Sequence, residues 1–374
     1  MPKISVLMSC YNHDKFVGEA IESVLNQSFK DFELLIIDDN STDKTFDIVN
    51  SFKDPRIKAF RNEKNFGMVF NTNSLIKKSN GDYIAIINSD DSWLPEKLQK
   101  QLDFLENNSG YGACFTVANI IDEDNKIIKS NIQESLKYLE LDRFGFLNYF
   151  FFYNNPLCYP SVLIRKKVFD KTGFFNPAYI ILLDIEMWIR ICLAGFEIKI
   201  LKENLTNFRI LKNGGNLSGK NHKTIIRNSL ELKEIYKSYQ HIKNYDEFIK
   251  IFPEYEKIAI ANKNLVGFYY LIDFCYKKYF IGNSKPSQKN IKNFMVEFIH
   301  QKSFEDSKFF DILSSELGIN YREYSAIVDK YPTGLIALKS RLNDKKMKLL
   351  ILLLIIFLTE ILIDFLTKIL IDFF

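Results

Sequence analysis

The sequence predicts an α/β fold in which a mostly parallel sheet is flanked by helices, followed by a helical C-terminal region. In the first hundred residues, short apolar runs alternate with segments whose apolar residues recur at helical spacing. Strands that alternate with helices form βαβ units and a parallel sheet. From about residue 220 onward helical spacing prevails, as in Leu232, Ile235, Tyr236 and Tyr239. With 374 residues the chain is long enough for two domains.

The expected elements follow one another along the chain. Strands are predicted at Lys3–Ser9, Phe32–Ile37, Arg56–Phe60, Tyr83–Ile87, Gly112–Ile121 and Tyr159–Ile164. Helices are predicted at Phe16–Leu25, at Asp43–Phe52 after a Ser41 or Thr42 cap, at Met68–Lys78 ended by Gly81, from Pro95 onward, and at Asp184–Ala194. We expect an α/β domain at residues 1–218, a helical region at 219–345 and a hydrophobic helix at 346–374.

Composition narrows the function classes. The formal charge of +4 is small for this length and no dense stripe of Lys and Arg is present, so we expect no nucleic-acid partner. The five cysteines are far apart and form no Cys-x-x-Cys pair, which argues against zinc knuckles and a disulfide framework. The apolar run after Met-Pro-Lys is too short for a signal peptide. A cytoplasmic location is therefore expected.

Two acidic clusters, Asp38-Asp39 and Asp90-Asp91, each follow a predicted strand. Ligands of open α/β sheets bind at the carboxyl ends of the strands, so both clusters are expected at one crevice. Carboxylates there could bind a nucleoside, or a divalent cation that neutralises a leaving diphosphate. Each cluster also fits an ordinary turn before a helix, because Asp is common in turns. One turn can serve both purposes.

A carboxylate that could act as a general base occurs in the stretch Leu183-Asp184-Ile185-Glu186. An acceptor hydroxyl is a weak nucleophile, and a positioned carboxylate can take its proton during attack. Asp184 and Glu186 are both candidates. Asp184 also stands just ahead of an apolar helical segment, so a helix cap with a charged first turn explains the same pattern. Periodicity alone favours the cap.

Several stretches occur in an order that is specific for one family. They are Ser5–Asn12, Ser23–Phe29, Leu35–Asp43, Asn65-x-Gly67, Asn73, Gly81–Ala85 leading into Ser89-Asp90-Asp91, Gly173–Phe175, and Asp184 with Trp188. Over about residues 3–210 the chain resembles the family 2 glycosyltransferases, which have a Rossmann-like GT-A fold. The resemblance implies an inverting hexosyltransferase of polysaccharide biosynthesis. It would move a sugar from a nucleotide-diphosphate donor, UDP by family frequency, to a hydroxyl of a glycan or lipid-linked acceptor.

The resemblance also implies a role for each matching residue. The implied substrate-binding residues are Ser9, Tyr11, Asp38, Asp39, Asn65 and Asp90. Among them, Tyr11 and Asp39 would hold the base and nearby nucleoside. Asp38 would support that turn, and Asp90 would lie near the ribose. Asp91 would bind Mn²⁺ or Mg²⁺, and Asp184 would be the general base of a single in-line displacement.

Four positions depart from the family pattern. Asn88 and Thr72 stand where the family often has Asp and Arg. Leu211 replaces the histidine of an Arg-x-His motif, and His222 could take its place from a loop. Leu183 replaces the usual Glu before the Asp. The remaining protein ligands of the metal are therefore undetermined.

The last part of the chain, Met347–Phe374, is also the most hydrophobic, and Lys345 and Lys346 precede it. Leu349–Leu358 carries no charge, and beyond it charged residues form one polar stripe of a helix: Glu360, Asp364, Lys368 and Asp372. A spanning helix needs about 20 apolar residues, so we favour a helix that lies on the inner-membrane surface. A spanning helix is second, and self-association or packing on its own domain is the further alternative.

Three rival functions use a similar sheet. The departures at Asn88, Thr72 and Leu211 are compatible with a non-catalytic nucleotide-sugar-binding protein. The retained Asp39, Asp91 and Asp184 favour an enzyme. A nucleotidyltransferase would show a Gly-rich, basic loop after the first strand, and Cys10-Tyr11-Asn12-His13 is not such a loop. No Gly-x-Gly-x-x-Gly follows that strand, which disfavours a dinucleotide oxidoreductase.

Overall fold

The computed structural model describes residues 1–128, 139–153 and 155–212 throughout, together with Leu136 and part of 216–253. These residues belong to one compact unit, Met1–Glu256. Most of the expected helical region at 219–345, and all of the hydrophobic helix at 346–374, lie outside the described residues. Among the residues that the structure describes, no helix is long and apolar enough to cross a membrane.

The predicted α/β fold is confirmed. Its strands are β1 (Ile4–Cys10), β2 (Phe32–Asp38), β3 (Ile57–Arg61), β4 (Tyr83–Asn88), β5 (Ser92–Trp93), β6 (Tyr111–Ile121), β7 (Ile127–Ile128), β8 (Leu163–Arg165) and β9 (Glu197–Arg209). They form a sheet in the order β3-β2-β1-β4-β8-β6-β9-β5, with β7 beside β6. The first four strands of this order are parallel, and so are β6 and β9. β8 is antiparallel to both of its neighbours and joins these two parallel parts.

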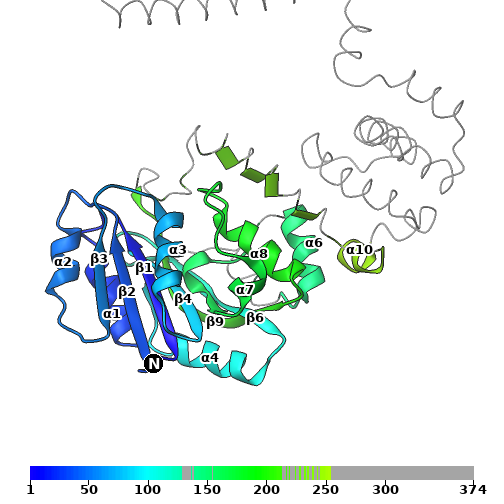
Figure 1. Ribbon diagram of the computed structural model, residues 1–374, viewed down its shortest axis with the longest axis horizontal. Helices are drawn as coiled ribbons and strands as arrows, with labels where there is room; N and C mark the ends of the chain where they lie inside the picture. The colour runs from blue at the N-terminus through cyan, green and yellow to red at the C-terminus, as the bar shows by residue number, and fades with distance from the viewer. Residues whose placement is uncertain are drawn as a thin grey trace, which may run out of the picture. The chain divides into compact units, whose positions relative to one another are not determined.

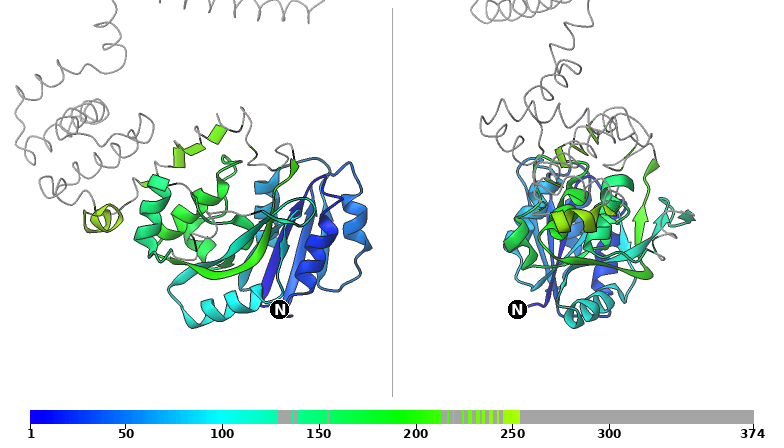
Figure 2. Two further views of the ribbon diagram at one scale, coloured as in Figure 1. Left: turned by 180° about the vertical axis from the view of Figure 1, so that it is seen from behind. Right: turned by 90° about the vertical axis from the view of Figure 1, so that its right-hand side faces the viewer.

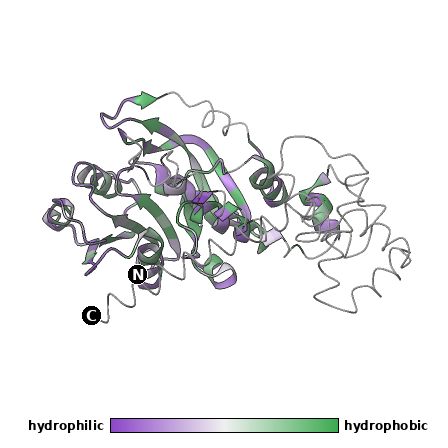
Figure 3. Ribbon diagram, turned by 90° about the horizontal axis from the view of Figure 1, so that it is seen from above, coloured by the Kyte–Doolittle hydropathy of each residue, from purple (hydrophilic) through white to green (hydrophobic). Residues whose placement is uncertain are grey.

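Helices cover both faces of the sheet (Figures 1 and 2). They are α1 (Val17–Leu25), α2 (Thr45–Ser51), α3 (Met68–Lys78), α4 (Lys97–Asn107), α6 (Arg143–Tyr153), the 3₁₀ turn η1 (Tyr159–Ser161), α7 (Val168–Thr172), α8 (Leu183–Leu193) and α10 (Tyr245–Ile251). Alternate residues of β1, such as Val6 and Met8, pack in one core with Ile21 of α1 and Leu98 of α4. α3 contacts β1 and β2 from the opposite face. Figure 3 shows the hydrophobic strands between the helices.

Three local predictions were wrong. The strand expected at Tyr159–Ile164 begins as η1, and only Leu163–Arg165 pairs in the sheet. Helix α3 ends at Lys78, before Gly81. Gly81 is instead packed against β1, where a Cβ atom would lie 2.6 Å from the backbone nitrogen of Ser5. Helix α2 begins after Lys44, so it is not capped by Ser41 or Thr42.

The register of the central strands aligns the ends that carry the acidic clusters. β1 pairs with β2 on one side and with β4 on the other. Cys10 lies opposite Asp38, and Ser9 lies opposite Asn88. The turns after β1, β2 and β4 therefore meet at one edge of the sheet, as the sequence predicted.

Candidate active site

A cavity of about 830 Å³ opens at this edge. The predicted site residues that line it are Ser9, Tyr11, Asp39, Asn65, Asp90 and Asp184. The structure thus brings one member of each acidic cluster together with the candidate base. Asp38 and Asp91 were also predicted to bind substrate or metal, but their side chains are buried behind the cavity wall.

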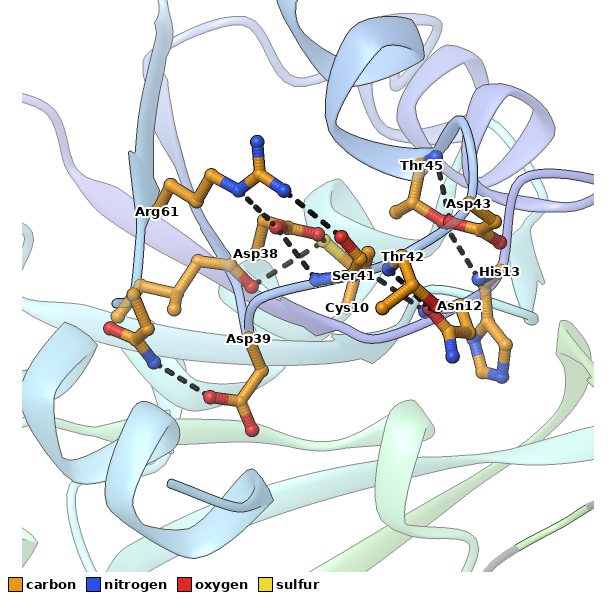
Figure 4. Close-up of polar contacts among 12 residues, drawn as sticks. Cys10, Asn12, His13, Asp38, Asp39, Ser41, Thr42, Asp43, Thr45 and Arg61 are labelled. Atoms are coloured by element: carbon orange, nitrogen blue, oxygen red, sulfur yellow. Dashed lines mark hydrogen bonds and ion pairs between the residues drawn. The ribbon is translucent and has the colours of Figure 1, made fainter. Parts of the chain in front are cut away.

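Two turns form one side of the cavity and are tied to each other. Asn12 and Asn40 have positive φ values of 52° and 63°, which Asn tolerates better than most residues. The backbone N–H of Asn12 donates to Ser41 Oγ at 3.0 Å, and Asn12 Oδ1 accepts from the backbone N–H of Thr42 at 2.9 Å. The N–H of His13 donates to Thr45 Oγ1 at 2.8 Å. Figure 4 shows these cross-links, which fix the two turns relative to each other.

Asp38 and Asp39 are adjacent, but their carboxylates point in different directions (Figure 4). Asp38 is fully buried, accepts from the N–H of Ser41 at 3.1 Å and pairs with Arg61 Nε at 3.3 Å. It holds the turn after β2. Because Asp38 does not line the cavity, the geometry favours a supporting role for it, and the predicted substrate contact stays a prediction.

The Asp39 carboxylate organises the loop that precedes α3. One of its oxygens accepts from Asn62 Nδ2 at 2.7 Å and from the N–H of Phe66 at 2.9 Å, and the other accepts from the N–H of Gly67 at 2.8 Å. Gly67 has φ 87°, a conformation that favours glycine. The Asn65-x-Gly67 motif is therefore explained by a loop that wraps around a carboxylate.

A chain of amides extends from Asp39 to β1. Asn62 Nδ2 also donates to Asn71 Oδ1 at 2.8 Å, and Asn71 Nδ2 donates to Ser9 Oγ at 3.0 Å. Asn71 is completely buried on α3. These bonds connect β1, β2 and α3, so the side chains that line this part of the cavity are held in one rigid network.

Asp90 and Asp91 follow β4 and differ in what they face. Asp90 lines the cavity, whereas Asp91 is 1% exposed and lies behind it. Asp91 accepts from the N–H of Arg209 at 2.8 Å and from Asn88 Nδ2 at 2.9 Å. Burial raises the pKa of both carboxyls, and the charge of Asp90 raises that of Asp91 further. The geometry therefore favours Asp90 over the predicted Asp91 as the carboxylate that a ligand or cation would meet.

Arg209, the last residue of β9, holds the turn after β4 in place. Its Nε donates to the carbonyl of Asp90 at 2.8 Å, and its guanidinium also bonds to Glu19 at 2.9 Å and to the carbonyl of Asp122 at 2.9 Å. The arginine of the expected Arg-x-His motif is thus a structural residue of the site. His222, the suggested replacement for the missing histidine, lies outside the described residues.

Asp184 lines the cavity from a different element, as the second residue of α8. The residue preceding the helix is Leu182, so Asp184 is not the helix cap that periodicity favoured. Its oxygens accept from Asn155 Nδ2 and from the N–H of Ile185, both at 2.7 Å. Desolvation by the surrounding protein raises the pKa of Asp184 to about 6. Such a carboxylate is ionised at neutral pH and is a stronger base than an ordinary aspartate.

The second candidate base, Glu186, has another role. It is 4% exposed, and both of its oxygens accept from Arg190, at 2.7 and 2.6 Å. The same guanidinium donates to the carbonyl groups of Thr172 and Phe174. Glu186 therefore anchors the loop at Gly173–Phe175 and has no oxygen directed at the cavity.

Several cavity residues were not singled out from the sequence as binding residues. His13 lines the cavity, and its Nδ1 lies 2.8 Å from Ser89 Oγ. Asn155 touches Asp184, and Phe66 and Phe70 stack with their ring centres 4.7 Å apart. His13 belongs to the turn after β1, which was expected at the same crevice as the acidic clusters. Its place in the sequence could therefore have marked it as a binding residue. Asn155 carries no such signal, because its contact with Asp184 spans two separate elements.

The described residues offer few ligands for a metal ion. Among the residues that the structure describes, no group of three or more His, Cys, Asp or Glu side chains could hold a metal ion. Magnesium sites in nucleotide-binding enzymes need fewer, because one or two carboxylates act with oxygens of the substrate phosphates. Asp90 offers a hard oxygen ligand beside the cavity, and a cation would offset the desolvation of its carboxylate.

Known proteins match the chain in sequence. Residues 5–173 match the family described as Glycosyl transferase family 2. The chain is 32% identical over 255 residues to an uncharacterized glycosyltransferase of Methanocaldococcus jannaschii, covering 67% of this chain and 85% of that protein. It is 30% identical over 237 residues to the UDP-Glc:alpha-D-GlcNAc-diphosphoundecaprenol beta-1,3-glucosyltransferase WfaP of Escherichia coli, covering 63% of this chain and 87% of that protein.

A solved structure matches the fold. S. aureus TarS 1-349, crystallised in complex with UDP-GlcNAc, superposes with a TM-score of 0.51 at 17% identity. The match covers 87% of this chain and 79% of that chain. At this level of identity the likeness concerns the fold alone, and it confirms the predicted GT-A architecture.

Proposed function

The chain belongs to glycosyl transferase family 2, and from that premise we propose that it transfers a hexose from a UDP-sugar to a hydroxyl of a glycan or lipid-linked acceptor with inversion. The observation that carries the proposal is the composition of one cavity. Asp39 and Asp90 follow strands β2 and β4, and Asp184, whose pKa is raised to about 6, comes from α8. The first pair suits a nucleotide-diphosphate donor, and Asp184 suits an acceptor.

In the proposed reaction the acceptor hydroxyl attacks the anomeric carbon while its proton passes to Asp184. A bond forms between the acceptor oxygen and that carbon. The bond from the carbon to the diphosphate oxygen breaks, and its electron pair leaves with the nucleotide diphosphate. Attack opposite the leaving group inverts the configuration. Asp184 is suited to this role because a base is most effective when its pKa is near the working pH.

Donor binding would use the rigid side of the cavity. The Asp39 carboxylate has about four acceptor positions, of which three are occupied by Asn62, Phe66 and Gly67. The remaining position could accept an N–H group of uracil. Tyr11 lines the same cavity, is 44% exposed and could stack its ring on the base. The E. coli relative is named for a UDP-glucose donor, which supports UDP as the nucleotide.

A divalent cation, Mn²⁺ or Mg²⁺, is part of the proposal. Asp90 would hold it together with phosphate oxygens of the donor, and Asp91 behind it would keep the turn in place. When bound, the cation would neutralise charge on the leaving diphosphate. The sequence-based assignment of the metal to Asp91 itself stays a prediction, which paired variants can decide.

The acceptor is proposed to be lipid-linked. The name of the E. coli relative specifies a sugar on diphosphoundecaprenol as its acceptor. Apolar residues dominate the cavity wall near Asp184, namely Leu157, Pro177, Ile180, Ile181 and Leu183. Binding at the inner-membrane surface through residues 346–374, from the cytoplasmic side, stays a prediction for a segment outside the described residues.

The test is a donor screen with the full-length protein. Nucleotide sugars are incubated with and without Mn²⁺, and with EDTA, and release of nucleotide diphosphate is followed. With a donor that turns over, NMR of the product gives the anomeric configuration. Turnover of a UDP-sugar that needs the cation and inverts the configuration supports the proposal. Retention of configuration would exclude the single displacement. If the protein neither bound nor turned over any donor, the donor-dependent function would be excluded.

A further inference from the structure

The segment that leads into α8 is held by a residue that lies far away in the sequence. Three consecutive backbone N–H groups, of Ile180, Ile181 and Leu182, donate to the carboxylate of Glu231 at 2.9, 3.0 and 2.9 Å. Glu231 is 7% exposed. Ile180 and Ile181 line the cavity, and Asp184 follows two residues after Leu182.

These three bonds have a clear physical reason. The N–H groups at and just before the start of a helix have no acceptor within the helix, and the helix dipole favours negative charge there. A buried carboxylate in turn needs donors to compensate for lost hydration. Leu182, which directly precedes α8, has no polar side chain to offer. Glu231 supplies from elsewhere in the chain the acceptor that the helix start needs.

The position of Asp184 depends on this arrangement. It lies in the first turn of α8, directly after the tethered segment, so a shift of 180–182 would move its carboxylate within the cavity. General-base catalysis requires the base within hydrogen-bond reach of the proton it takes. A displacement of about 1 Å at a catalytic group can cost about 100-fold in rate.

We propose that Glu231 is a positioning residue for glycosyl transfer, which fixes residues 180–182 and thereby aims Asp184 at the acceptor hydroxyl. This inference rests on the proposed role of Asp184 as the base. Glu231 does not line the cavity, so it acts through the backbone of the segment and through its charge. The negative charge of Glu231 is also one of the influences that raise the pKa of Asp184, after burial.

The other titratable groups around Asp184 are neutral or paired, so Glu231 is the charge whose removal should change its pKa. Cys158 and Tyr159 approach from the η1 side, and burial raises the pKa of both, so they are neutral at neutral pH. On α8 itself, Glu186 is paired with Arg190 at 2.6 Å. The amide of Asn155 carries no charge. Removing the charge of Glu231 should therefore lower the pKa of Asp184.

The first test measures the tether directly by hydrogen exchange of the full-length protein. Glu231→Gln keeps the size of the side chain but replaces one accepting oxygen by an NH₂ group. We expect the N–H groups of residues 180–182 to exchange about tenfold faster or more, the loss expected for a bond to a charged acceptor. Glu22→Gln removes an exposed carboxylate of α1, far from residues 180–182 in the fold, and is the matched control, with exchange like the wild type.

The second test measures catalysis. For Glu231→Gln we expect kcat to fall about 10- to 100-fold with the KM for the UDP-sugar nearly unchanged. The acidic limb of the kcat–pH profile should move to lower pH, because loss of the Glu231 charge lowers the pKa of the base. A residue needed only for folding would not move that limb. Glu231→Asp keeps the charge but shortens the side chain, so kcat should fall while the limb stays close to that of the wild type.

The outcomes separate the two proposals. Wild-type exchange at residues 180–182, or a wild-type kcat and acidic limb, in folded Glu231→Gln would overturn the positioning role. If Glu231→Gln does not fold, the exchange and kcat of Glu231→Asp decide by the same criteria. A wild-type protein that turns over no donor, or an Asp184→Asn variant with the wild-type rate, would instead overturn the proposed function. The exchange experiment still decides whether Glu231 holds the segment.

Discussion

The two sides of the cavity use carboxylates for different purposes. On the side of β1 and β2, Asp38 and Asp39 are surrounded by donors from backbone and amide groups, and their bonds hold turns and a loop in place. On the side of α8, Asp184 accepts one hydrogen bond from a side-chain amide and one from a neighbouring backbone N–H, and its other neighbours are mainly apolar. Burial raises its pKa to about 6. Hydrogen bonds hold the first side rigidly, whereas the second side keeps a desolvated carboxylate, the one proposed as the base.

This difference teaches that residue type alone does not assign a role. The same side chain is a scaffold where several N–H groups converge on it, and a candidate base where desolvation is left uncompensated. Substitutions on the two sides should therefore change different kinetic parameters. Loss of Asp184 should act on kcat, whereas loss of Asp39 should act on donor affinity.

The largest effect is expected from Asp184→Asn. The amide cannot accept the acceptor proton, so kcat should fall about 10²- to 10⁴-fold, the usual contribution of a general base. UDP binding should change little, because Asp184 lies away from the donor side. Initial rates and calorimetric UDP titration measure the two quantities, with Asp170→Asn on the exposed face of α7 as the control. A wild-type kcat in this variant would show that Asp184 is not the base. The proposed difference between the two sides of the cavity would then be wrong.

Asp39→Asn should produce the opposite pattern. The NH₂ group of the amide cannot accept hydrogen bonds as the second carboxylate oxygen does. At least one of the bonds from Asn62, Phe66 or Gly67 is therefore lost. Hydrogen bonds to a charged group contribute about 1.5–3 kcal/mol each, so the Kd for UDP should rise about 10- to 100-fold. The acidic limb of the kcat–pH profile should stay where it is. A shift of that limb would show that the two sides are coupled.

The sequence predicted much of the first side, because local rules determine it. Apolar alternation and helical spacing predicted the elements from β1 to α3, and the clusters at strand ends predicted the shared crevice. β9 was missed because its pairing with β6 shifts register between Leu201 and Asn204, so that Lys202 and Glu203 interrupt the alternation of the strand.

Orientation and long-range contacts could not be predicted in the same way. Asp90 and Asp91 are neighbours in one tight turn, and no periodic pattern says which of the two faces the cavity. Glu231 contacts residues 180–182 from a distant part of the chain, and nothing in its own neighbourhood marks it. Such features depend on tertiary packing, which a single sequence does not reveal.

A paired comparison within the second acidic cluster should have an intermediate effect. Asp90→Asn should weaken Mn²⁺ binding in the presence of UDP about tenfold or more, since the carboxylate at the cavity is lost. Asp91→Asn should instead lower the thermal stability, because a buried acceptor of the Arg209 N–H is altered. Electron paramagnetic resonance of Mn²⁺ and thermal unfolding measure these two responses. If Asp91→Asn is the variant that loses the metal, the sequence-based assignment is right and the geometric preference for Asp90 is wrong.

The smallest effect is expected at Asn155, and its sign is what matters. Its amide donates to Asp184 Oδ2 and so favours the ionised carboxylate, which lowers the pKa of Asp184. Asn155→Ala should therefore raise that pKa. Activity requires the deprotonated base and is lost as the pH falls through the pKa, so the acidic limb should move upward by about half to one pH unit. Glu231→Gln should move the same limb downward. Opposite shifts of the acidic limb in Asn155→Ala and Glu231→Gln would identify Asp184, which both side chains influence, as the titrating group. Shifts in the same direction would mean that another group controls the limb.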